Sequence, residues 1–317
     1  MKPAFLLFAL LAAFPASGQG WPSKPIRAIV PVGTGSSTDI VHRIVLEQLS
    51  SQLGQPVVIE NRAGAGGIIG TEIVVKAQPD GYTLLANGAA HTIAPALNKN
   101  VPYDPVRDFV AVVPIGSSPS VLVVSPAKGI KSVAELVAAA KARPNALNFS
   151  SVGMGTATHL SAERFRFSAG IQAVHIPFKG GAEAMTEVIA GRADFFFGPV
   201  ALVLPQVRDG RLLALAVNTD KRSAALPQVR TMREAGYRDT EYPIWFAIFA
   251  PAKTPRDLVQ RLNRETHKAM DVPRVRERLA GLGVEPMPMS PDEFAALVKR
   301  EVALNAVLAA KVGLKPE

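Results

Sequence analysis

The sequence predicts an α/β protein made of two lobes with a ligand cleft between them. Short apolar runs alternate with helical patterns, and the alternation restarts after a proline-rich segment at residues 101–105. Each half also contains a loop of small polar residues between a strand and a helix. Because strands that alternate with helices become parallel neighbours, each lobe is expected to hold a mainly parallel sheet flanked by helices.

The first half of the chain predicts three strands, with a helix after each of the first two. Gly54 suits the end of the first helix, and Asp80-Gly81 suits the turn into the third strand. The expected elements are a strand at 26–32, a small polar loop at 33–39, a helix ending near Gly54, a strand at 56–60, a helix to Ala77 and a strand at 82–86.

The second half repeats this order. Ser132 and Glu135 form a capping box that opens a helix to Ala142, and a second small polar loop occupies residues 153–159. The expected strands lie at 121–124, 147–151, 172–176, 193–197 and 213–217.

The C-terminal part is expected to return to the first lobe. A strand at 245–249 is followed by helix starts at Thr254 and Ser290, each with a proline as the next residue. The chain therefore crosses between the lobes near residues 121 and 248. The expected boundaries are 21–121 plus 249–317 for lobe 1 and 122–248 for lobe 2.

The first residues have the pattern of an export signal. Lys2 precedes an apolar run at 4–14, and the small residues that follow favour cleavage after Gly18, with Gly20 as the alternative. The run is shorter than the roughly 20 residues that span a bilayer. We therefore expect residues 1–18 to be removed and the mature protein to be soluble in the periplasm.

The composition excludes several classes of protein. The chain has no cysteine, so disulfides, thiolate metal sites and cysteine nucleophiles are excluded, and an oxidising compartment poses no risk of mispairing. The formal charge is +9, but the basic residues are spread along the chain and mixed with acids. Since only two Trp and four Tyr could stack on bases, nucleic acid is not an expected partner.

Both small polar loops have the composition of an anion site. Backbone N–H groups at the start of a helix are unpaired and carry partial positive charge, so they bind carboxylate or phosphate oxygens without an arginine. Glycine permits close approach to the backbone, and hydroxyls add donors. For either loop alone an ordinary capped turn remains the alternative, whereas two such loops in equivalent positions favour binding.

Other chemistries have weaker support. Both loops only approach the dinucleotide fingerprint, because a threonine stands where it requires glycine or alanine. The pair His159 and Glu163 could support a metal, but a hydrogen bond from His159 that shapes the second loop is preferred. Asp194 is either a buried structural acceptor or a carboxylate that orients the ligand.

Several longer motifs occur along the mature chain. They are Lys24-Pro25-Ile26-Arg27, Glu60-Asn61-Arg62-Ala63-Gly64-Ala65-Gly66-Gly67, Pro79-Asp80-Gly81-Tyr82-Thr83, Pro102-Tyr103-Asp104-Pro105 and His175-Ile176-Pro177-Phe178-Lys179-Gly180-Gly181. In this order and spacing they resemble one known family, the Bug (TctC-like) extracytoplasmic solute-binding receptors. The resemblance implies a type II-like, two-lobe periplasmic binding protein. Such a receptor closes over a small carboxylate and delivers it to inner-membrane subunits of a tripartite tricarboxylate transporter, without catalysis, cofactor or metal.

The resemblance also implies which residues contact the ligand, and it leaves the particular carboxylate open. The first loop differs from the usual family pattern at Thr34, Gly35 and Ser36, and Ala94 stands where an asparagine is common. The implied contacts are Gly33, Thr34, Gly35, Ser36, Ser37, Thr38, Asp39, Asn87, Ala89, Ala90, Gly153, Gly155, Thr156, His159 and Asp194.

We expect a monomeric receptor. Two other functions remain open from sequence: a secreted hydrolase that uses a Ser and a His in the cleft, and a receptor that serves a sensory partner. No Gly-x-Ser-x-Gly elbow occurs in the chain, so the hydrolase would need its His and acid from elsewhere in the fold.

Overall fold

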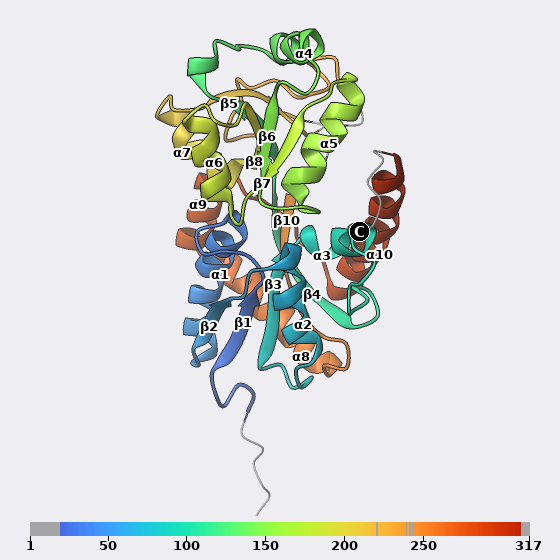
Figure 1. Cartoon of the computed structure of the whole chain (residues 1–317). Coiled ribbons are helices and arrows are strands. Elements are labelled where there is room, and N and C mark those ends of the chain that lie inside the picture. Colours follow the sequence, from blue (N-terminus) through green and yellow to red (C-terminus); the bar gives the residue numbers. More distant parts are fainter. Residues whose placement is uncertain (1–19, 220, 239, 241, 243, 312–317) are drawn as a thin grey trace, which may run out of the picture.

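The computed structural model of the chain describes residues 20–311 apart from 220, 239, 241 and 243. The expected export signal at 1–18 lies outside these residues. The described chain forms two lobes, one drawn mainly in blue, teal and orange and the other in green and yellow (Figure 1). None of the described helices combines the length and apolar character needed to cross a membrane.

Each lobe is built on one sheet. Lobe 1 holds the strand order β11-β4-β10-β3-β1-β2, and lobe 2 holds β7-β6-β8-β5-β9. The first sheet consists of β1 (Ile26–Val30), β2 (Val57–Asn61), β3 (Thr83–Gly88), β4 (Phe109–Ser118), β10 (Ile244–Pro251) and β11 (Glu285–Pro286). The second consists of β5 (Ser120–Val124), β6 (Asn148–Ser151), β7 (Val174–Pro177), β8 (Phe195–Pro199) and β9 (Leu213–Val217).

Both sheets are mixed, which corrects the expectation of mainly parallel sheets. Strands β1, β2 and β3 are parallel, as are β6, β7 and β8. In contrast, β10 is antiparallel to β3 and β4, and β5 is antiparallel to β8 and β9. Strands β5 and β10 are the two that arrive from the other lobe, so each runs away from the cleft while its neighbours run toward it.

The lobe boundaries differ from those expected at one crossing. The first crossing lies between β4 and β5, separated by Pro119, close to the expected position near residue 121. The second precedes β10, because Ile244 already pairs with Ser118 of the first sheet. The expected crossing near residue 248 is therefore corrected to a position before Ile244.

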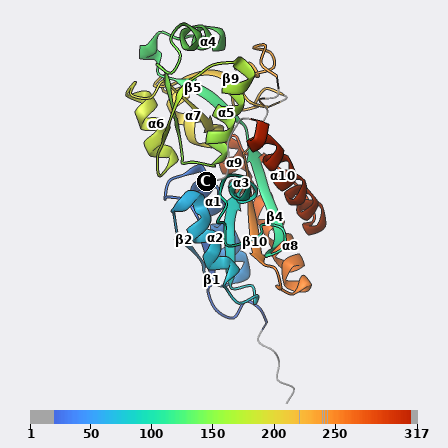
Figure 2. The same cartoon turned by 45° about the vertical axis from the view of Figure 1, so that its right-hand side comes forward.

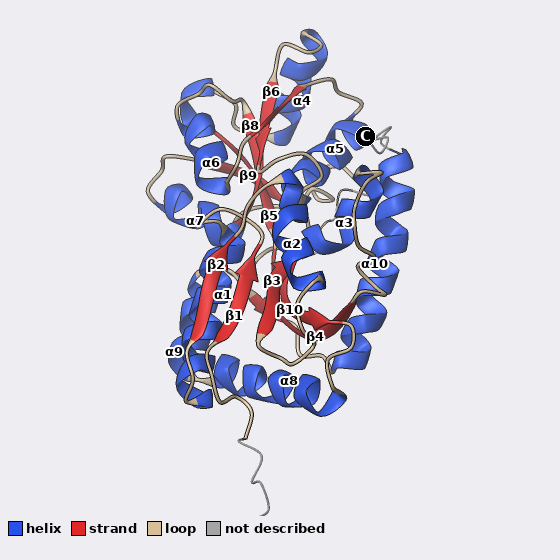
Figure 3. Ribbon diagram, turned by 60° about the horizontal axis from the view of Figure 1, so that its bottom comes forward, coloured by secondary structure: helices blue, strands red, loops and turns tan. Residues whose placement is uncertain are grey.

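Helices cover both sheets. In lobe 1, α1 packs against α8 and α9, and α10 packs against α3 and β4, which confirms the expected return of the C-terminal helices (Figures 2 and 3). The helices of lobe 1 are α1 (Ser37–Leu53), η1 (Ala65–Gly67), α2 (Ile68–Val75), α3 (Ala90–Leu97), α8 (Arg256–Asp271), α9 (Pro273–Gly281) and α10 (Pro291–Lys311). Those of lobe 2 are η2 (Pro126–Lys128), α4 (Val133–Ala142), α5 (Ala157–Ala169), α6 (Gly181–Ile189) and α7 (Val200–Arg208).

Buried apolar side chains hold each sheet to its helices and also connect the two lobes. In lobe 2, Phe195 and Phe197 of β8 pack with α4 and α5, whereas Phe196 packs with α6 and α7 on the other face, as strand alternation requires. The core of lobe 1 includes Ala157 and Leu160, which belong to α5 of lobe 2. The two lobes therefore share buried apolar contacts, and the cleft between them is closed.

Candidate ligand-binding site

A cleft lies between the lobes, and helix starts make up much of its wall. The lining residues belong to the starts of α1 (36–38), α2 (66 and 67), α3 (89 and 90), α5 (156–158), α6 (179–181) and α7 (199 and 202), to the end of β3 (87 and 88), and to positions Pro31, Val32, Val152, Ile244 and Trp245.

The lobes touch at the rim of this cleft. A Cβ atom added to Gly66 of lobe 1 would lie 3.2 Å from the carbonyl oxygen of Met154 in lobe 2. A Cβ added to Gly155 of lobe 2 would lie 3.0 Å from Cδ1 of Leu97 in lobe 1. These close approaches show that the chain is in a closed arrangement in which a bound molecule would contact both lobes.

The first loop (residues 33–39) is held by Asp39. Gly35 has a φ of +78°, and its N–H donates to Oδ2 of Asp39 at 2.9 Å. The N–H of Asp39 in turn donates to the Ser36 hydroxyl at 3.2 Å, which caps α1. Burial opposes ionisation of Asp39, but hydrogen bonds from Arg43, Gly35 and Asn61 outweigh it and hold the pKa of this carboxyl below its ordinary value.

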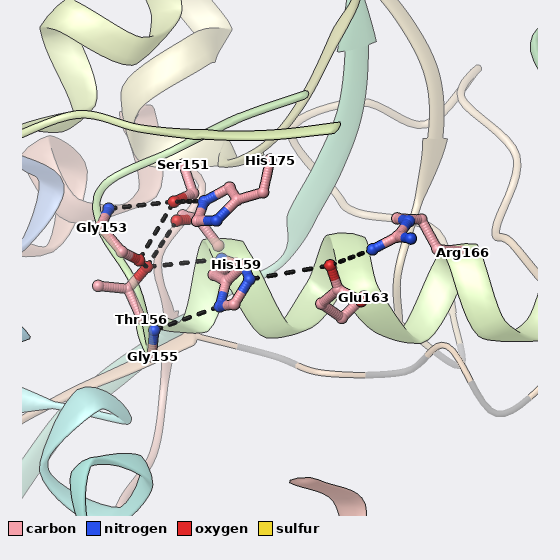
Figure 4. A network of polar contacts seen from close by, with 9 residues as sticks. Ser151, Gly153, Gly155, Thr156, His159, Glu163, Arg166 and His175 are labelled. Carbon is pink, nitrogen blue, oxygen red and sulfur yellow. Dashed lines mark hydrogen bonds and ion pairs between the residues drawn. The ribbon is translucent and has the colours of Figure 1, made fainter. Parts of the chain in front are cut away.

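The second loop (residues 153–159) is built in the same way around His159 (Figure 4). Gly155 has a φ of +74°, and its N–H donates to Nδ1 of His159 at 3.2 Å. The hydroxyl of Thr156 caps α5 by accepting from the N–H of His159 at 3.5 Å. The expected role of His159, a hydrogen bond that shapes the loop, is confirmed.

His159 performs this role as a neutral side chain. It stacks on His175, with ring centroids 4.0 Å apart, and its Nε2 lies 3.8 Å from the Glu163 carboxylate. Burial, together with the nearby His175 and Arg166, lowers the pKa of His159 to about 3. Nδ1 is then free of a proton and accepts from Gly155, while the Nε2 proton faces Glu163.

The cleft wall offers donors without strong side-chain charge. Within the described part of the chain, the N–H groups of Ser37 and Thr38 in lobe 1, and of Ala157 and Thr158 in lobe 2, have no acceptor. They lie at helix starts, where the helix dipole favours an anion. Lys179, which is exposed, is the one cationic side chain on the described cleft wall, and no Asp or Glu lines it.

The structure brings part of the expected site together on the cleft wall and places the rest behind it. The lining includes Ser36, Ser37, Thr38, Asn87, Ala89, Ala90 and Thr156. Gly33, Thr34, Gly35, Asp39, Gly153, Gly155 and His159 belong to the two loops but not to the lining. Among them, Asp39 and His159 shape the loops by accepting from the N–H groups of Gly35 and Gly155. That each of the expected residues contacts a ligand stays a prediction.

Asp194 lies away from the cleft, which corrects its place among the expected ligand contacts. It precedes β8, whose other end, Pro199, reaches the cleft, so about 16 Å of strand separates them. Its carboxylate accepts from the N–H of Asn148 at 2.8 Å and pairs with Nζ of Lys128 at 2.7 Å. Asp194 is the buried structural acceptor that the sequence left as an alternative.

The start of α6 was missed as part of the site. Lys179, Gly180 and Gly181 follow β7 and line the cleft. The signal was present, since a glycine pair stands between a strand and a helix, but these residues lack the hydroxyls that marked the other two loops. Gly66, Gly67 and Thr158 were also outside the expected contacts and line the cleft.

The cleft wall shows no hydrolase site, and no metal site is found among the described residues. The hydrogen bond between the Ser151 hydroxyl and Nε2 of His175, 2.6 Å long, joins two residues that do not line the cleft. The cleft wall carries serines, Ser36 and Ser37, but no His, Asp or Glu side chain that could serve as their base. No group of three or more His, Cys, Asp or Glu side chains that could hold a metal ion occurs in the described part of the chain.

Two lobes joined by crossing segments, with helix starts around a closed cleft between them, define a solute-binding protein of the periplasmic type. The chain belongs to the tripartite tricarboxylate transporter family receptors (TctC), whose family model matches residues 41–314. This confirms the resemblance to the Bug and TctC-like receptors.

Relatives and solved structures agree with this assignment. Protein BugT of Bordetella pertussis is 36% identical over 313 residues, which cover 98% of this chain and 96% of that protein. The periplasmic binding protein BugD has a structure with a TM-score of 0.89 at 32% identity, covering 94% of this chain and 100% of that one. An R. palustris structure with adipate has a TM-score of 0.90 at 30% identity, covering 94% of this chain and 100% of that one.

A structure of MatC from Rhodopseudomonas palustris with bound malate has a TM-score of 0.87 at 29% identity and covers 91% of this chain and 99% of that one. The family and these neighbours are substrate-binding proteins. Fold and relatives therefore agree on a receptor that binds a small solute.

Proposed function

We propose that this chain is an extracytoplasmic receptor that captures a small carboxylate-containing solute and delivers it to the membrane subunits of a tripartite tricarboxylate transporter. The solute binds in the cleft between the lobes, held by the backbone amides and hydroxyls of the first and second loops. The exported chain acts in the periplasm as a monomer after its signal has been removed, and it catalyses no reaction.

The observation that carries this proposal is the convergence of helix starts on one closed cleft. The free amides of Ser37 and Thr38 face the same cleft as those of Ala157 and Thr158, so an anion there receives donors from both lobes. The wall itself carries no acidic side chain among the described residues. Because the bound solute contacts both lobes, it favours the closed state over an open one.

The neighbours support a carboxylate as the solute. One R. palustris structure holds adipate and MatC holds malate, both of which are carboxylates. These ligands indicate that the cleft of this fold accommodates a carboxylate group. The identity of the solute in this chain depends on its own cleft wall, where side chains such as Asn87 and Leu202 face the space.

The experiment is to identify what the purified receptor carries. Mass spectrometry of small molecules released by denaturing the protein should find one unaltered carboxylate, and the same compound should raise the melting temperature of ligand-free protein. At 100 times its dissociation constant a ligand adds about 2.7 kcal/mol to the free energy of unfolding. Steady conversion of an ester panel, or failure of every carboxylate to stabilise the protein, would contradict the proposal.

A further inference from the structure

Asn87 is a buried amide without a partner. It lies in β3, is 3% exposed and lines the cleft. Its side chain makes no hydrogen bond to any described residue, yet neither amide atom is sealed from the open space of the cleft. The amide is therefore available to whatever the cleft holds.

The other two buried asparagines of the described chain are paired within the protein. Asn218 accepts from the N–H of Ser120 at 2.9 Å and donates to the Ser161 hydroxyl at 3.2 Å. Asn305 accepts from the Tyr242 hydroxyl at 3.0 Å and donates to Thr92. Buried polar groups are normally paired in this way because an unpaired one is costly. In contrast, the free amide of Asn87 is available to pair with a group that the cleft holds.

Apart from the exposed Lys179 of lobe 2, the remaining unpaired polar side chains on the described cleft wall also belong to lobe 1. The hydroxyls of Ser37 and Thr38 have no partner among the described residues. In lobe 2 the corresponding hydroxyls are occupied, because Thr158 accepts from the N–H of Val152 and Thr156 bonds the carbonyl of Gly153. Lobe 1 thus presents side chains that can recognise a second functional group next to the carboxylate.

The chemistry of Asn87 narrows what that second group is. A carboxylate accepts hydrogen bonds only, so it can satisfy the NH₂ of Asn87 but leaves Oδ1 without a donor. A hydroxyl or an ammonium group would supply that donor. An ammonium group also needs a carboxylate to balance its charge in a closed cleft, and no Asp or Glu lies on the described wall. A hydroxyl needs no such partner.

We propose that the ligand is a hydroxycarboxylate whose hydroxyl is recognised by Asn87. This inference rests on the carboxylate-receptor function proposed above and names the substrate class of the same cleft. The carboxylate lies against the amides of the helix starts, and the hydroxyl donates to Oδ1 of Asn87 while it accepts from Ser37, Thr38 or the Asn87 NH₂. An analogue without the hydroxyl leaves Oδ1 unpaired when the cleft closes, so it binds more weakly.

The test compares three substituents on three carbon skeletons, which removes the dependence on ligand size. The hydroxy compounds are malate, lactate and mandelate; their unsubstituted analogues are succinate, propionate and phenylacetate; their amino analogues are aspartate, alanine and phenylglycine. Affinities for the refolded, ligand-free receptor are measured by calorimetry. On the carbon skeleton that binds most tightly, the affinity of the hydroxy compound should be about 10-fold or more higher than that of either analogue.

The outcomes separate this inference from the proposed function. Equal affinities of the hydroxy and unsubstituted compounds are expected if a water molecule forms the hydrogen bonds of the Asn87 amide. That result would overturn the inference, while the proposed function as a carboxylate receptor would still stand. Tighter binding of the amino compound overturns it as well. If no carboxylate of any skeleton binds, the proposed function fails and the inference fails with it.

Variants of Asn87 test whether this side chain causes the preference for hydroxycarboxylates over unsubstituted carboxylates. In Asn87→Leu, which keeps the side-chain size and removes both polar atoms, the affinity ratio of hydroxy to unsubstituted compound should fall to about 1 while unsubstituted carboxylates still bind. Asn87→Ala provides the same comparison if the leucine variant does not fold. Asn100→Leu, the same change at an exposed position of lobe 1, is the control and should keep the full ratio. A ratio that survives in both Asn87 variants would contradict the assignment.

Discussion

The first and second loops have the same backbone arrangement and different side-chain chemistry. In each, a glycine with positive φ donates its N–H to the side chain four residues later, and a hydroxyl caps the helix that follows. That acceptor is the charged Asp39 in lobe 1 and the neutral His159 in lobe 2. A carboxylate and a neutral imidazole therefore fill the same structural role, so the acceptor at this position of the loop does not need a negative charge.

The loops also differ in what they present to the cleft. The first loop keeps the hydroxyls of Ser37 and Thr38 free, whereas the second has Ala157 at the matching position and uses the Thr158 hydroxyl to hold its own backbone. Both loops offer free amides to an anion. Lobe 1 therefore carries the side chains that can select a ligand, and lobe 2 supplies mainly backbone donors and apolar surface when it closes.

The largest expected effect comes from removing the positive-φ glycine of the first loop. Gly35→Val forces a β-branched residue to a φ of +78°, so the loop should distort and the thermal stabilisation by ligand should be lost. Gly129→Val is the matched control. Gly129 has a φ of +71°, no atom within 4 Å of an added Cβ and no place on the cleft wall.

Both variants should lose about 1–3 kcal/mol of stability from backbone strain. They should differ in ligand response, which differential scanning calorimetry measures with and without the ligand. If Gly35→Val responds to ligand as fully as Gly129→Val does, the first loop does not hold the anion.

A smaller effect is expected from removing the neutral acceptor of the second loop. His159→Leu leaves the N–H of Gly155 without its partner, so ligand affinity should fall roughly 10-fold. His159→Asn should restore most of it, because Asp39 shows that a side chain of this length reaches the matching N–H in the first loop. Equal affinities of the two variants, measured by calorimetry, would show that the acceptor has no role.

The free energy of unfolding should depend on pH through His159 and not through Asp39, whereas ligand affinity should change little over the same pH range. His159 titrates near 6.5 when unfolded, and burial lowers its pKa to about 3 in the folded chain. The unfolded state therefore takes up a proton first, and the stability from neutral His159 is complete above pH 6.5 and lost as pH falls toward 3. Between about pH 7.5 and pH 5 this loss is about 2 kcal/mol.

Asp39 adds no such loss in this window, because its folded pKa lies below the ordinary value of 3.8. Urea denaturation at both pH values should show a loss in wild type that is about 2 kcal/mol larger than in His159→Asn. Ligand affinity should change less than about twofold over the same range, since folded His159 stays neutral. Identical pH profiles of the two proteins would contradict the assignment of a neutral, buried His159.

The smallest expected effect on the ligand is that of Asp194→Ala. The change leaves Lys128 and the N–H of Asn148 without their partner, so stability should fall by about 1–3 kcal/mol. Because Asp194 lies at the far end of β8, affinity for each carboxylate should stay within about twofold of wild type. A change in the relative affinities for different carboxylates would contradict a purely structural role for Asp194 and support its contact with the ligand.

Local signals in the sequence predicted much of the fold. Gly54 ends α1 with a positive φ, and the Ser290 and Glu293 capping box opens α10, with the Ser290 N–H donating to Glu293 at 2.8 Å. The ten-residue strand β4 was not predicted, since it contains Pro114 and Gly116, and register shifts in its pairing with β10 accompany them. The antiparallel direction of β5 and β10 depends on where the chain crosses between lobes, which no local pattern records.

The candidate site was predicted at its loops and less well in its details. Gly, Ser and Thr between a strand and a helix marked both loops because these residues suit a helix start. That the Ser36 hydroxyl caps the helix while the Ser37 hydroxyl stays free depends on the backbone turn, which composition does not specify. Asp194 was expected near the ligand because it is a carboxylate flanked by apolar residues at the end of a strand. Which end of β8 faces the cleft depends on the topology of the sheet, which these neighbours do not indicate.

The most direct measurement records the backbone amides of the two loops in solution. In ¹H–¹⁵N spectra of the deuterated receptor, saturating carboxylate should shift the amide protons of Ser37 and Thr38 in lobe 1 and of Ala157 and Thr158 in lobe 2 downfield, as new hydrogen bonds to an anion require. The amide of Gly129 should not move. Shifts confined to one lobe, or absent from all four amides while the ligand is bound, would contradict an anion held between the two loops.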